Sequence, residues 1–361
     1  MSGQRMNGRG GAYWDHGETL ADRFRAWARD SKNLYGYAVR GLAEDWEAGG
    51  PTWVVCQGYE HAPRGAMIQI RLLAGVFRLV LTGKAQGLVQ FYPCLGGNAP
   101  ASEAWPVMRN VIEAHAAELH AALAVTPQTN EVGRSAPLLA GLFDLVAACG
   151  VRRIRLLEVG ASAGLNLLLD YYAVRGDSWQ FGPADSTVQL AHAIQGHVRP
   201  EPFTVVARAG CDLNPVAATS AEGQLLLTSF VWPFDVDRHR RLAGALKIAA
   251  SHPVQVDQAP ASDWLQRATV PVGPETLTVI WHSITQMYWD VEELAAVEAI
   301  LQRAGGQQLL GEVGLEFDLN DPNGSEPELR TRLWSRDADL PRQRLLGTAH
   351  YHGVPVRLAG T

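Results

Sequence analysis

One segment, LLEVGASAGLNLLLDYY at 156–172, constrains the fold of this chain more than any other. It begins as a near-continuous apolar run, which is typical of a strand buried in a parallel sheet. The run passes into a turn of small residues between Gly160 and Gly164, and a second apolar stretch that follows predicts a helix. A strand, a glycine-rich turn and a helix in this order indicate an α/β protein whose backbone can approach a ligand closely.

The same alternation continues toward the C-terminus. Apolar runs predict further strands, and amphipathic stretches predict helices between them, with a closing antiparallel hairpin: strands at 225–232, 254–256, 276–281 and 307–313, helices at 237–252 and 290–306, and the hairpin at 342–360. Asp290 has the position of an N-cap for the last helix. Repeated strand–helix units predict a doubly wound, Rossmann-like sheet, and a final hairpin is also a feature of methyltransferase sheets.

The first third of the chain has a different pattern. Residues 1–16 are polar and rich in glycine, which predicts a disordered lead-in, and residues 17–127 carry apolar side chains mainly at helical spacing. We therefore expect a helical N-terminal region that forms a lid or a substrate wall, followed by the Rossmann-like domain over 128–361. That domain has an insertion at about 173–223, where the sequence is rich in glycine, proline and polar residues.

Composition narrows the classes of function. The net charge of -6 and the pI near 6.0 give no electrostatic case for nucleic acid as a partner. No apolar run approaches the roughly 20 residues of a membrane helix, and no signal-peptide core follows the N-terminus. The four cysteines form no CxxC pair, and His350 and His352 have no third ligand nearby in the sequence. We expect a cytoplasmic protein without a metal or membrane partner.

The glycine turn has four interpretations. In the first, it binds S-adenosylmethionine, whose sites have an acidic residue two positions before a G-x-small-x-G turn. Glu158, Gly160, Ser162 and Gly164 fit this pattern, with Ser162 in the place of the usual middle glycine. Glu158 would then hold the amino group of the methionyl moiety. Asn166, just beyond the turn, belongs to the same expected cofactor site.

The other interpretations use the same residues differently. GASAG matches the G-x-S-x-G nucleophile elbow of α/β hydrolases, with Ser162 as the nucleophile and His282, His350 or His352 as the base. That elbow normally follows several strands of the sheet, whereas the upstream region here is mostly helical. A dinucleotide site needs G-x-G-x-x-G, which the turn lacks. The turn can also join strand and helix without binding a ligand.

Several blocks together are similar to one family. TNEVGRS at 129–135, GASAGLN at 160–166 and the stretches at 208–216, 231–246 and 278–284 resemble the DUF2332 family of uncharacterised bacterial proteins. The resemblance covers most of the chain. It implies a fold close to that of S-adenosylmethionine-dependent methyltransferases, and it implies no substrate.

Acidic residues at strand ends are candidates for the nucleoside part of the cofactor. In such sheets the second strand ends in an acid that binds the ribose hydroxyls. If 225–232 is that strand, Asp235 is the ribose acid and Asp263, after the next strand, lies near the adenine. Asp212 in GCDLNP is the other candidate for the ribose and could also contact a substrate.

Two further sets complete the expected site. Asn130, Glu131 and Arg134 can clamp a carboxylate of methionine or of the substrate. Alternatively, Thr129 or Asn130 caps the helix that follows, and Glu131 lies in its first turn. His282 ends the strand at 276–281, where a general base would meet a substrate, or it is a hydrogen-bonded histidine that lines the cleft. Tyr288, just beyond, is expected in the wall of the pocket.

The sequence therefore predicts an S-adenosylmethionine-dependent methyltransferase that acts on a small molecule. Its main alternatives are a serine hydrolase that uses Ser162 and a non-catalytic S-adenosylmethionine-binding or scaffold protein. The hydrolase predicts loss of activity in Ser162→Ala and labelling by fluorophosphonates. The scaffold predicts binding without turnover.

Overall fold

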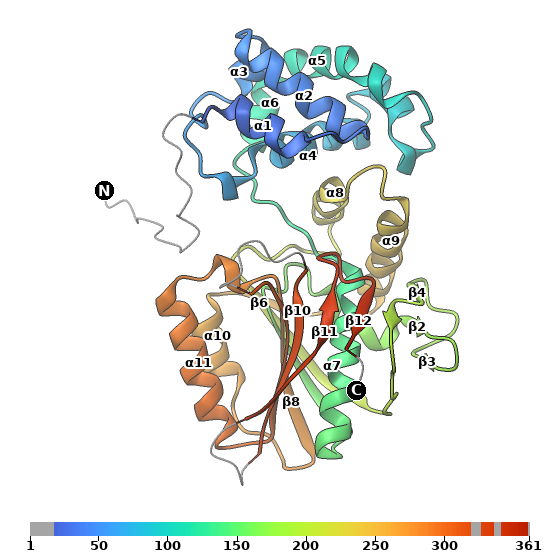
Figure 1. Cartoon of the computed structure of the whole chain (residues 1–361), viewed down its shortest axis with the longest axis vertical. Coiled ribbons are helices and arrows are strands. Elements are labelled where there is room, and N and C mark those ends of the chain that lie inside the picture. Colours follow the sequence, from blue (N-terminus) through green and yellow to red (C-terminus); the bar gives the residue numbers. More distant parts are fainter. Residues whose placement is uncertain (1–17, 319–325, 336–340, 360–361) are drawn as a thin grey trace. The chain divides into compact units, whose positions relative to one another are not determined.

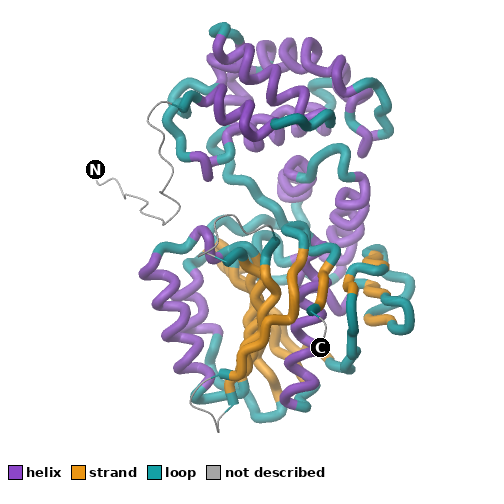
Figure 2. The backbone as a smooth tube through the Cα atoms, in the orientation of Figure 1, coloured by secondary structure: helices purple, strands orange, loops and turns teal. Residues whose placement is uncertain are grey.

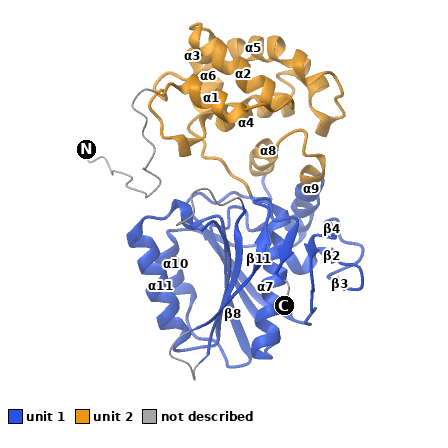
Figure 3. Ribbon diagram, in the orientation of Figure 1, with its two compact units in different colours: residues 1–11, 130–220, 240–361 blue, residues 12–129, 221–239 orange. Residues whose placement is uncertain are grey.

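The computed structural model describes residues 18–318, 326–335 and 341–359. The lead-in predicted at 1–16 lies outside these residues. The described chain forms two compact units, shown in Figure 3: a helical unit of 18–129 with 221–239, and a sheet unit of 130–220 with 240–359. The expected division near residue 128 is present, but the helical unit also takes a second segment from within the expected Rossmann-like domain.

The helical unit contains helices and no strand among its described residues (Figure 2). Its helices are α1 (Leu20–Ala28), α2 (Leu34–Glu47), α3 (Pro51–Val55), α4 (Ile68–Leu81), α5 (Ala104–Ala114), α6 (Ala116–Ala122) and α8 (Ala221–Phe230), with 3₁₀ turns η1 (Arg64–Ala66), η2 (Gln86–Phe91), η3 (Pro93–Leu95) and η4 (Ala101–Glu103). Thr19 and Asp22 form a capping box at the start of α1. The helical character predicted for this region is confirmed.

The segment predicted as a strand at 225–232 is instead part of α8. Its buried residues Gly223, Leu227 and Phe230 recur at helical spacing, and the Arg78 side chain of α4 donates to Ser229 at 3.1 Å. A short apolar run can be a buried strand or a buried helix, and periodicity within the run does not separate the two. Packing against α4 decides the outcome here.

The sheet unit is built on nine strands in the spatial order β5-β12-β11-β10-β9-β8-β1-β6-β7. Their bounds are β1 (Arg153–Val159), β5 (Ile194–Gln195), β6 (Thr204–Asp212), β7 (Val256–Gln258), β8 (Thr276–Ser283), β9 (Leu310–Glu316), β10 (Glu328–Trp334), β11 (Arg342–Ala349) and β12 (Val356–Leu358). A small second sheet contains β2 (Ala173–Arg175), β3 (Gln180–Phe181) and β4 (Gln189–Ala191). The predicted strands at 276–281 and 307–313 and the closing hairpin are confirmed.

The parallel half of the sheet has the doubly wound order. Numbered along the chain, its five parallel strands β1, β6, β7, β8 and β9 lie in the spatial order 3-2-1-4-5. The order reverses between β1 and β8, and ligands of such sheets bind outside the carboxyl ends of the strands at this point. The strands β10, β11 and β12 then continue outward from β9 as an antiparallel meander.

Helices cover the two faces of this sheet (Figure 1). On one face lies α7 (Ser135–Cys149), where Gly141 contacts Val313. On the other lie α10 (Ala261–Ala268) and α11 (Val291–Gly305), whose buried residues share a core with Val159 and Ile280. The last helix is α9 (Val236–Ser251), which runs across the boundary between the two units.

Two details of this unit bear on membranes and on missed strands. Among the described residues, Val132–Cys149 is the one stretch long and apolar enough to span a membrane, and 72% of it is buried inside the protein, as in a core helix. The insertion expected at about 173–223 contains β6, a strand of the main sheet. Thr204, Val206 and Ala207 of this strand are exposed, and Arg208 interrupts its apolar residues.

Strand pairing also places two candidate residues on opposite faces. Glu158 of β1 pairs with Trp281 of β8, and Val159 pairs with His282. Since successive side chains of a strand alternate between faces, Glu158 and Trp281 face α7, whereas His282 faces α11. The predicted site is therefore divided by the sheet.

Candidate functional site at the carboxyl ends of β1 and β8

The glycine turn leaves β1 through three residues in the left-handed region of backbone conformation. Gly160, Ser162 and Gly164 have φ values of 69°, 52° and 70°. Ala161 donates its N–H to the Cys211 carbonyl of β6 at 2.9 Å, which fixes the turn to the sheet. Glycine adopts this conformation freely, whereas Ser162 is strained in it.

The two glycines also permit close packing within the protein. A Cβ atom on Gly160 would lie 2.6 Å from the Thr285 hydroxyl, and one on Gly164 would lie 3.1 Å from Val256. Gly160 is thus required by the loop that follows β8, as well as by its φ value. This contact gives the glycine a structural reason that is independent of any ligand.

The helix predicted after the turn is a 3₁₀ segment, η6 (Leu165–Tyr171), with a non-helical residue at Leu168. The turn therefore does not lead into an α-helix, and the expected helix N-terminus with its positive dipole end is absent at this point. Backbone approach and side-chain polarity remain as means of binding a ligand here.

Glu158 is the most unusual charged residue of this site. Its side chain is 2% exposed and accepts one long hydrogen bond, from Asn166 Nδ2 at 3.4 Å. Its second oxygen has no hydrogen-bond partner among the described residues, and neither has the indole N–H of Trp281 beside it. Burial raises the pKa of Glu158 to about 8, although Asn166 and the nearby Trp281 and Arg134 oppose the shift.

Asn166 links Glu158 to the segment before α7. Its Oδ1 accepts from the Ser135 hydroxyl at 2.9 Å, and Asn130 Oδ1 accepts from the N–H of Leu165 at 2.8 Å. The TNEVGRS segment therefore holds the far end of the glycine turn. The amide oxygen of Asn130 is thereby used within the protein.

Glu131 and Arg134 brace two other loops. Glu131 caps η5 (Val132–Arg134) by accepting from Gly133 N–H at 3.2 Å, and its other oxygen lies 3.4 Å from His352 Nδ1. Arg134 donates to the Ser283 carbonyl and to the Tyr351 carbonyl, each at 3.1 Å. The cap of this segment is thus Glu131 and not Thr129 or Asn130, and Arg134 also donates to the Ser283 hydroxyl at 3.3 Å.

Asp212 ends β6, the second of the five parallel strands in chain order. Its two oxygens accept from the N–H groups of Ser162 and Asn214, both at 2.8 Å. The next residue, Leu213, is 63% exposed. A carboxylate has about four acceptor positions, so Asp212 holds the turn and retains capacity for two further donors.

The structure corrects the assignments of Asp235 and Asp263. Asp235 belongs to the helical unit, where it follows α8 and accepts from Arg238 at 3.0 Å, so it does not end a strand of the sheet. Asp263 is an exposed residue in the first turn of α10. The acid near the end of β7 is Asp257, which accepts from Trp264 Nε1 at 2.9 Å. Asp212 is the only one of the three candidates at a strand end.

His282 lies in a chain of charged groups on the α11 face. Its Nδ1 is 2.8 Å from Glu316 and its Nε2 is 3.0 Å from Glu312. Glu312 also binds Arg332, which binds Glu298 of α11 at 2.7 Å. Burial disfavours the charged ring, but the two carboxylates outweigh it and raise the pKa of His282 to about 9. With both ring nitrogens occupied, His282 is not available as a general base.

The loop after β8 is also strained. Ile284 has a φ of 51°, which is a real outlier for a β-branched residue. Tyr288, in the turn η7 (Gln286–Tyr288), is 73% exposed and lines neither of the two cavities described below. Strained non-glycine residues thus occur on both loops that meet at the reversal of strand order, Ser162 on one and Ile284 on the other. Such residues cluster at functional sites.

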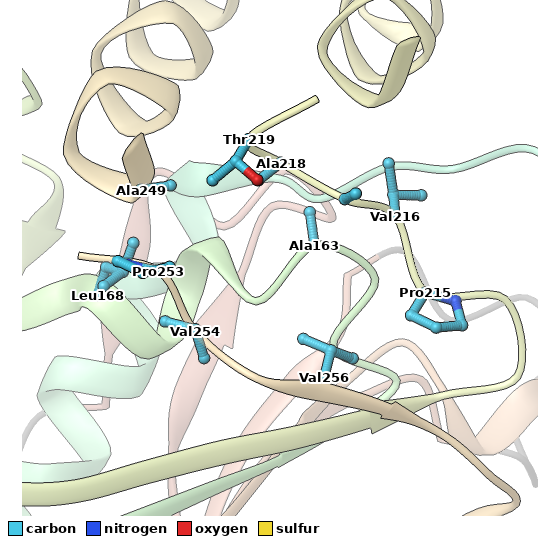
Figure 4. A pocket seen from close by; sticks show the side chains of 11 residues that line it. Ala163, Leu168, Pro215, Val216, Ala218, Thr219, Ala249, Pro253, Val254 and Val256 are labelled. Atoms are coloured by element: carbon cyan, nitrogen blue, oxygen red, sulfur yellow. The ribbon is translucent and has the colours of Figure 1, made fainter. Parts of the chain in front are cut away.

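An apolar cavity of about 300 Å³ opens beside the glycine turn (Figure 4). Its lining combines the turn, the loop after β6 and the segment that leads into β7: Ala163, Leu168, Pro215, Val216, Ala217, Ala218, Thr219, Ala249, Pro253, Val254 and Val256. Such a volume suits a small planar group. The sequence analysis missed this cavity because its residues come from three stretches that are far apart in the chain.

A second cavity, of about 510 Å³, lies on the α11 face beside His282, Glu312 and Glu316. Its charged lining is largely engaged in the chain that includes Arg332 and Glu298. Within the described ranges, no group of three or more His, Cys, Asp or Glu residues has the arrangement of a metal site.

These features define a doubly wound α/β protein whose strand order reverses between β1 and β8. The chain belongs to the DUF2332 family, described as uncharacterised proteins conserved in bacteria, whose match covers residues 18–357. No curated protein and no solved structure matched the chain.

Proposed function

We propose that the sheet unit binds S-adenosylmethionine at the carboxyl ends of β1 and β6 and transfers its methyl group to a small molecule. The observation that carries the proposal is Glu158, a buried carboxylate with one oxygen unpartnered at the reversal of strand order. A buried acid without a partner is costly, and a cationic ligand removes that cost.

The residues present fit the chemical groups of this cofactor. Glu158 would accept from the α-amino group, and the free acceptor positions of Asp212 would receive the ribose hydroxyls. The apolar cavity beside Ala163 would take the adenine ring. When bound, the cofactor supplies a methyl group activated by a sulfonium.

The chain's own contribution would be binding and alignment. Methyl transfer needs an in-line approach of nucleophile and methyl group, and positioning alone supplies much of the rate. His282 does not act as the base in this proposal, because Glu312 and Glu316 hold both of its ring nitrogens. The net charge of -6 favours a small-molecule acceptor over nucleic acid.

One observation favours a serine hydrolase as the second candidate. Ser162 has the positive φ expected of a nucleophile at a strained strand–turn elbow. Against it, β1 is the first strand of the sheet along the described chain, and His282 is held away from this role. Labelling of Ser162 by a fluorophosphonate, lost in Ser162→Ala, would favour the hydrolase.

Calorimetric titration with S-adenosylmethionine and S-adenosylhomocysteine tests the proposal. We expect micromolar binding that is accompanied at pH 7 by release of a proton, because Glu158 must ionise from a pKa of about 8. Titrations in two buffers of different ionisation enthalpy measure this proton. Binding without turnover on any acceptor would leave the scaffold alternative.

The matched variants are Gly160→Ala and Gly150→Ala. Both glycines have positive φ, at 69° and 72°, but a Cβ on Gly160 meets Thr285 whereas one on Gly150 meets nothing within 4 Å. We expect Gly160→Ala to lose binding at least tenfold and Gly150→Ala to keep it. Absence of binding by either ligand to the unmodified protein would refute the proposal.

A further inference from the structure

The loop after β8 is held from the opposite face of the sheet to the glycine turn. Glu316, the last residue of β9, accepts from the N–H groups of Thr285 (3.1 and 3.0 Å) and Gln286 (3.3 Å) and binds His282 Nδ1. One carboxylate therefore fixes two consecutive amides of the loop. The Ile284 N–H donates to the Leu315 carbonyl of the same strand at 2.8 Å.

Glu316 in turn belongs to a continuous chain of opposite charges. His282 joins Glu316 to Glu312, and Arg332 joins Glu312 to Glu298. Four strands and helices contribute: β8, β9, β10 and α11. Among the described residues packed on His282, the aromatic neighbour is Trp289, with ring centroids 6.2 Å apart.

The held loop reaches the candidate cofactor site through one contact. The Thr285 side chain lies against Gly160, so closely that a methyl group on the glycine would overlap with it. The loop can keep the strained φ of Ile284 only if its surroundings hold it there. The charged chain provides that restraint.

We propose that His282 and Glu316 are positioning residues, which hold the 284–286 loop against Gly160 and thereby shape the turn that binds the ligand. The inference takes its ligand from the proposed function, but the way in which the loop is held does not depend on that function. His282 acts as a charged link between Glu312 and Glu316, and Glu316 holds the loop amides. Neither residue touches the cofactor.

The pH dependence has a definite sign. Because the pKa of His282 is raised to about 9, its charge is present below that value in the folded protein and is lost above it. The groups that face its ring are Glu312 and Glu316 of β9, with Arg332 of β10 and Glu298 of α11 behind Glu312. The loop should therefore loosen between pH 8 and 10.

The experiment uses Glu316→Gln, with Glu326→Gln as control. Like Glu316, Glu326 is a carboxylate that is paired with a basic side chain. It binds Arg357 and Thr348 and has no described contact with the loop. Hydrogen exchange is followed in the peptides covering 160–164 and 284–286, and S-adenosylhomocysteine affinity is measured at pH 7.5.

We expect faster exchange at both segments in Glu316→Gln, roughly tenfold weaker binding at pH 7.5, and no change in the control. Ionisation of Glu158 strengthens binding over the same pH interval, so the effect of losing the His282 charge is followed by hydrogen exchange at the two segments and not by affinity. Faster exchange at 284–286 alone, or at neither segment, would overturn the inference.

The binding measurement and the hydrogen-exchange measurement can be interpreted separately if one of them fails. If the unmodified protein binds no S-adenosylhomocysteine, the proposed function fails while hydrogen exchange still decides the positioning role. If circular dichroism shows that Glu316→Gln does not fold, hydrogen exchange of the unmodified protein at increasing pH takes its place. After correction for intrinsic rates, an equal loss of protection in 160–164 and 284–286 above pH 9 supports the positioning role of His282. Constant protection of both segments overturns it.

Discussion

Glu158 and His282 end neighbouring strands of one sheet, and the protein treats their charges in opposite ways. On the α7 face, Glu158 is buried with one oxygen unpartnered and a pKa raised to about 8. On the α11 face, His282 is buried between two carboxylates and stays charged, while the pKa of Glu312 falls to about 2, because bonds to His282 and Arg332 outweigh burial.

The difference separates a site from its scaffold. A fully paired chain of buried charges holds elements together and leaves nothing for a ligand to complete. A buried acid that lacks a partner lowers stability and is completed by a ligand that brings a cation. By this criterion the proposed ligand side is the α7 face, although the histidine is the more familiar catalytic residue.

The largest effect on stability is expected when the chain of paired charges around His282 is broken. Arg332→Met leaves Glu312 buried with less compensation and should lower the free energy of unfolding by about 3–5 kcal/mol, measured by denaturant titration. Arg357→Met removes a half-exposed pair with Glu326 and should cost less than about 1 kcal/mol. Equal losses in the two variants would show that burial does not distinguish these pairs.

A substitution at Glu158, on the other face of the sheet, should raise the stability instead of lowering it. The pKa of Glu158 is higher in the folded chain, so folding takes up a proton and stability falls as pH rises from about 4.5 to 8. At pH 8 Glu158→Gln should raise the stability by about 2 kcal/mol and abolish cofactor binding. Chemical denaturation of both proteins at pH 5 and pH 8 measures this difference in stability. If Glu158→Gln is no more stable than the unmodified protein at pH 8, the result contradicts the unpaired state of Glu158.

The smallest effects concern the ribose acid. Asp212→Asn should weaken S-adenosylhomocysteine binding about tenfold, equivalent to about 1.4 kcal/mol. Asp235→Asn, in the helical unit, should change affinity less than twofold. Calorimetry on both variants decides between them, and a larger loss in Asp235→Asn would restore the assignment made from sequence order.

Much of the fold follows from local pattern in the sequence. The strand before Gly160, the strand at 276–281 and the Asp290-capped helix are marked by apolar period and caps within single segments. The strand β6 and helix α8 were missed because their burial depends on distant partners. One is a strand in which only Gly210 and Cys211 are buried, and the other is an apolar run that packs on α4.

The candidate site divides in the same way. The glycine turn and Glu158 could be found because their residues are adjacent in the chain. The roles of His282 and Arg134 could not, because their partners Glu312, Glu316 and Tyr351 come from distant segments that only strand pairing brings together. Sequence spacing located the polar residues but did not show which of them already had partners.

The helical unit has a second consequence, since it is assembled from two stretches of chain, 18–129 and 221–239. The polypeptide passes from one unit to the other at three points, so no single cut separates them. A fragment that begins at residue 130 would carry α8 without α4, and its apolar face would be uncovered. Proteolysis, truncation and gene fusion would have to act on both units together, and the two are expected to be inherited as one piece.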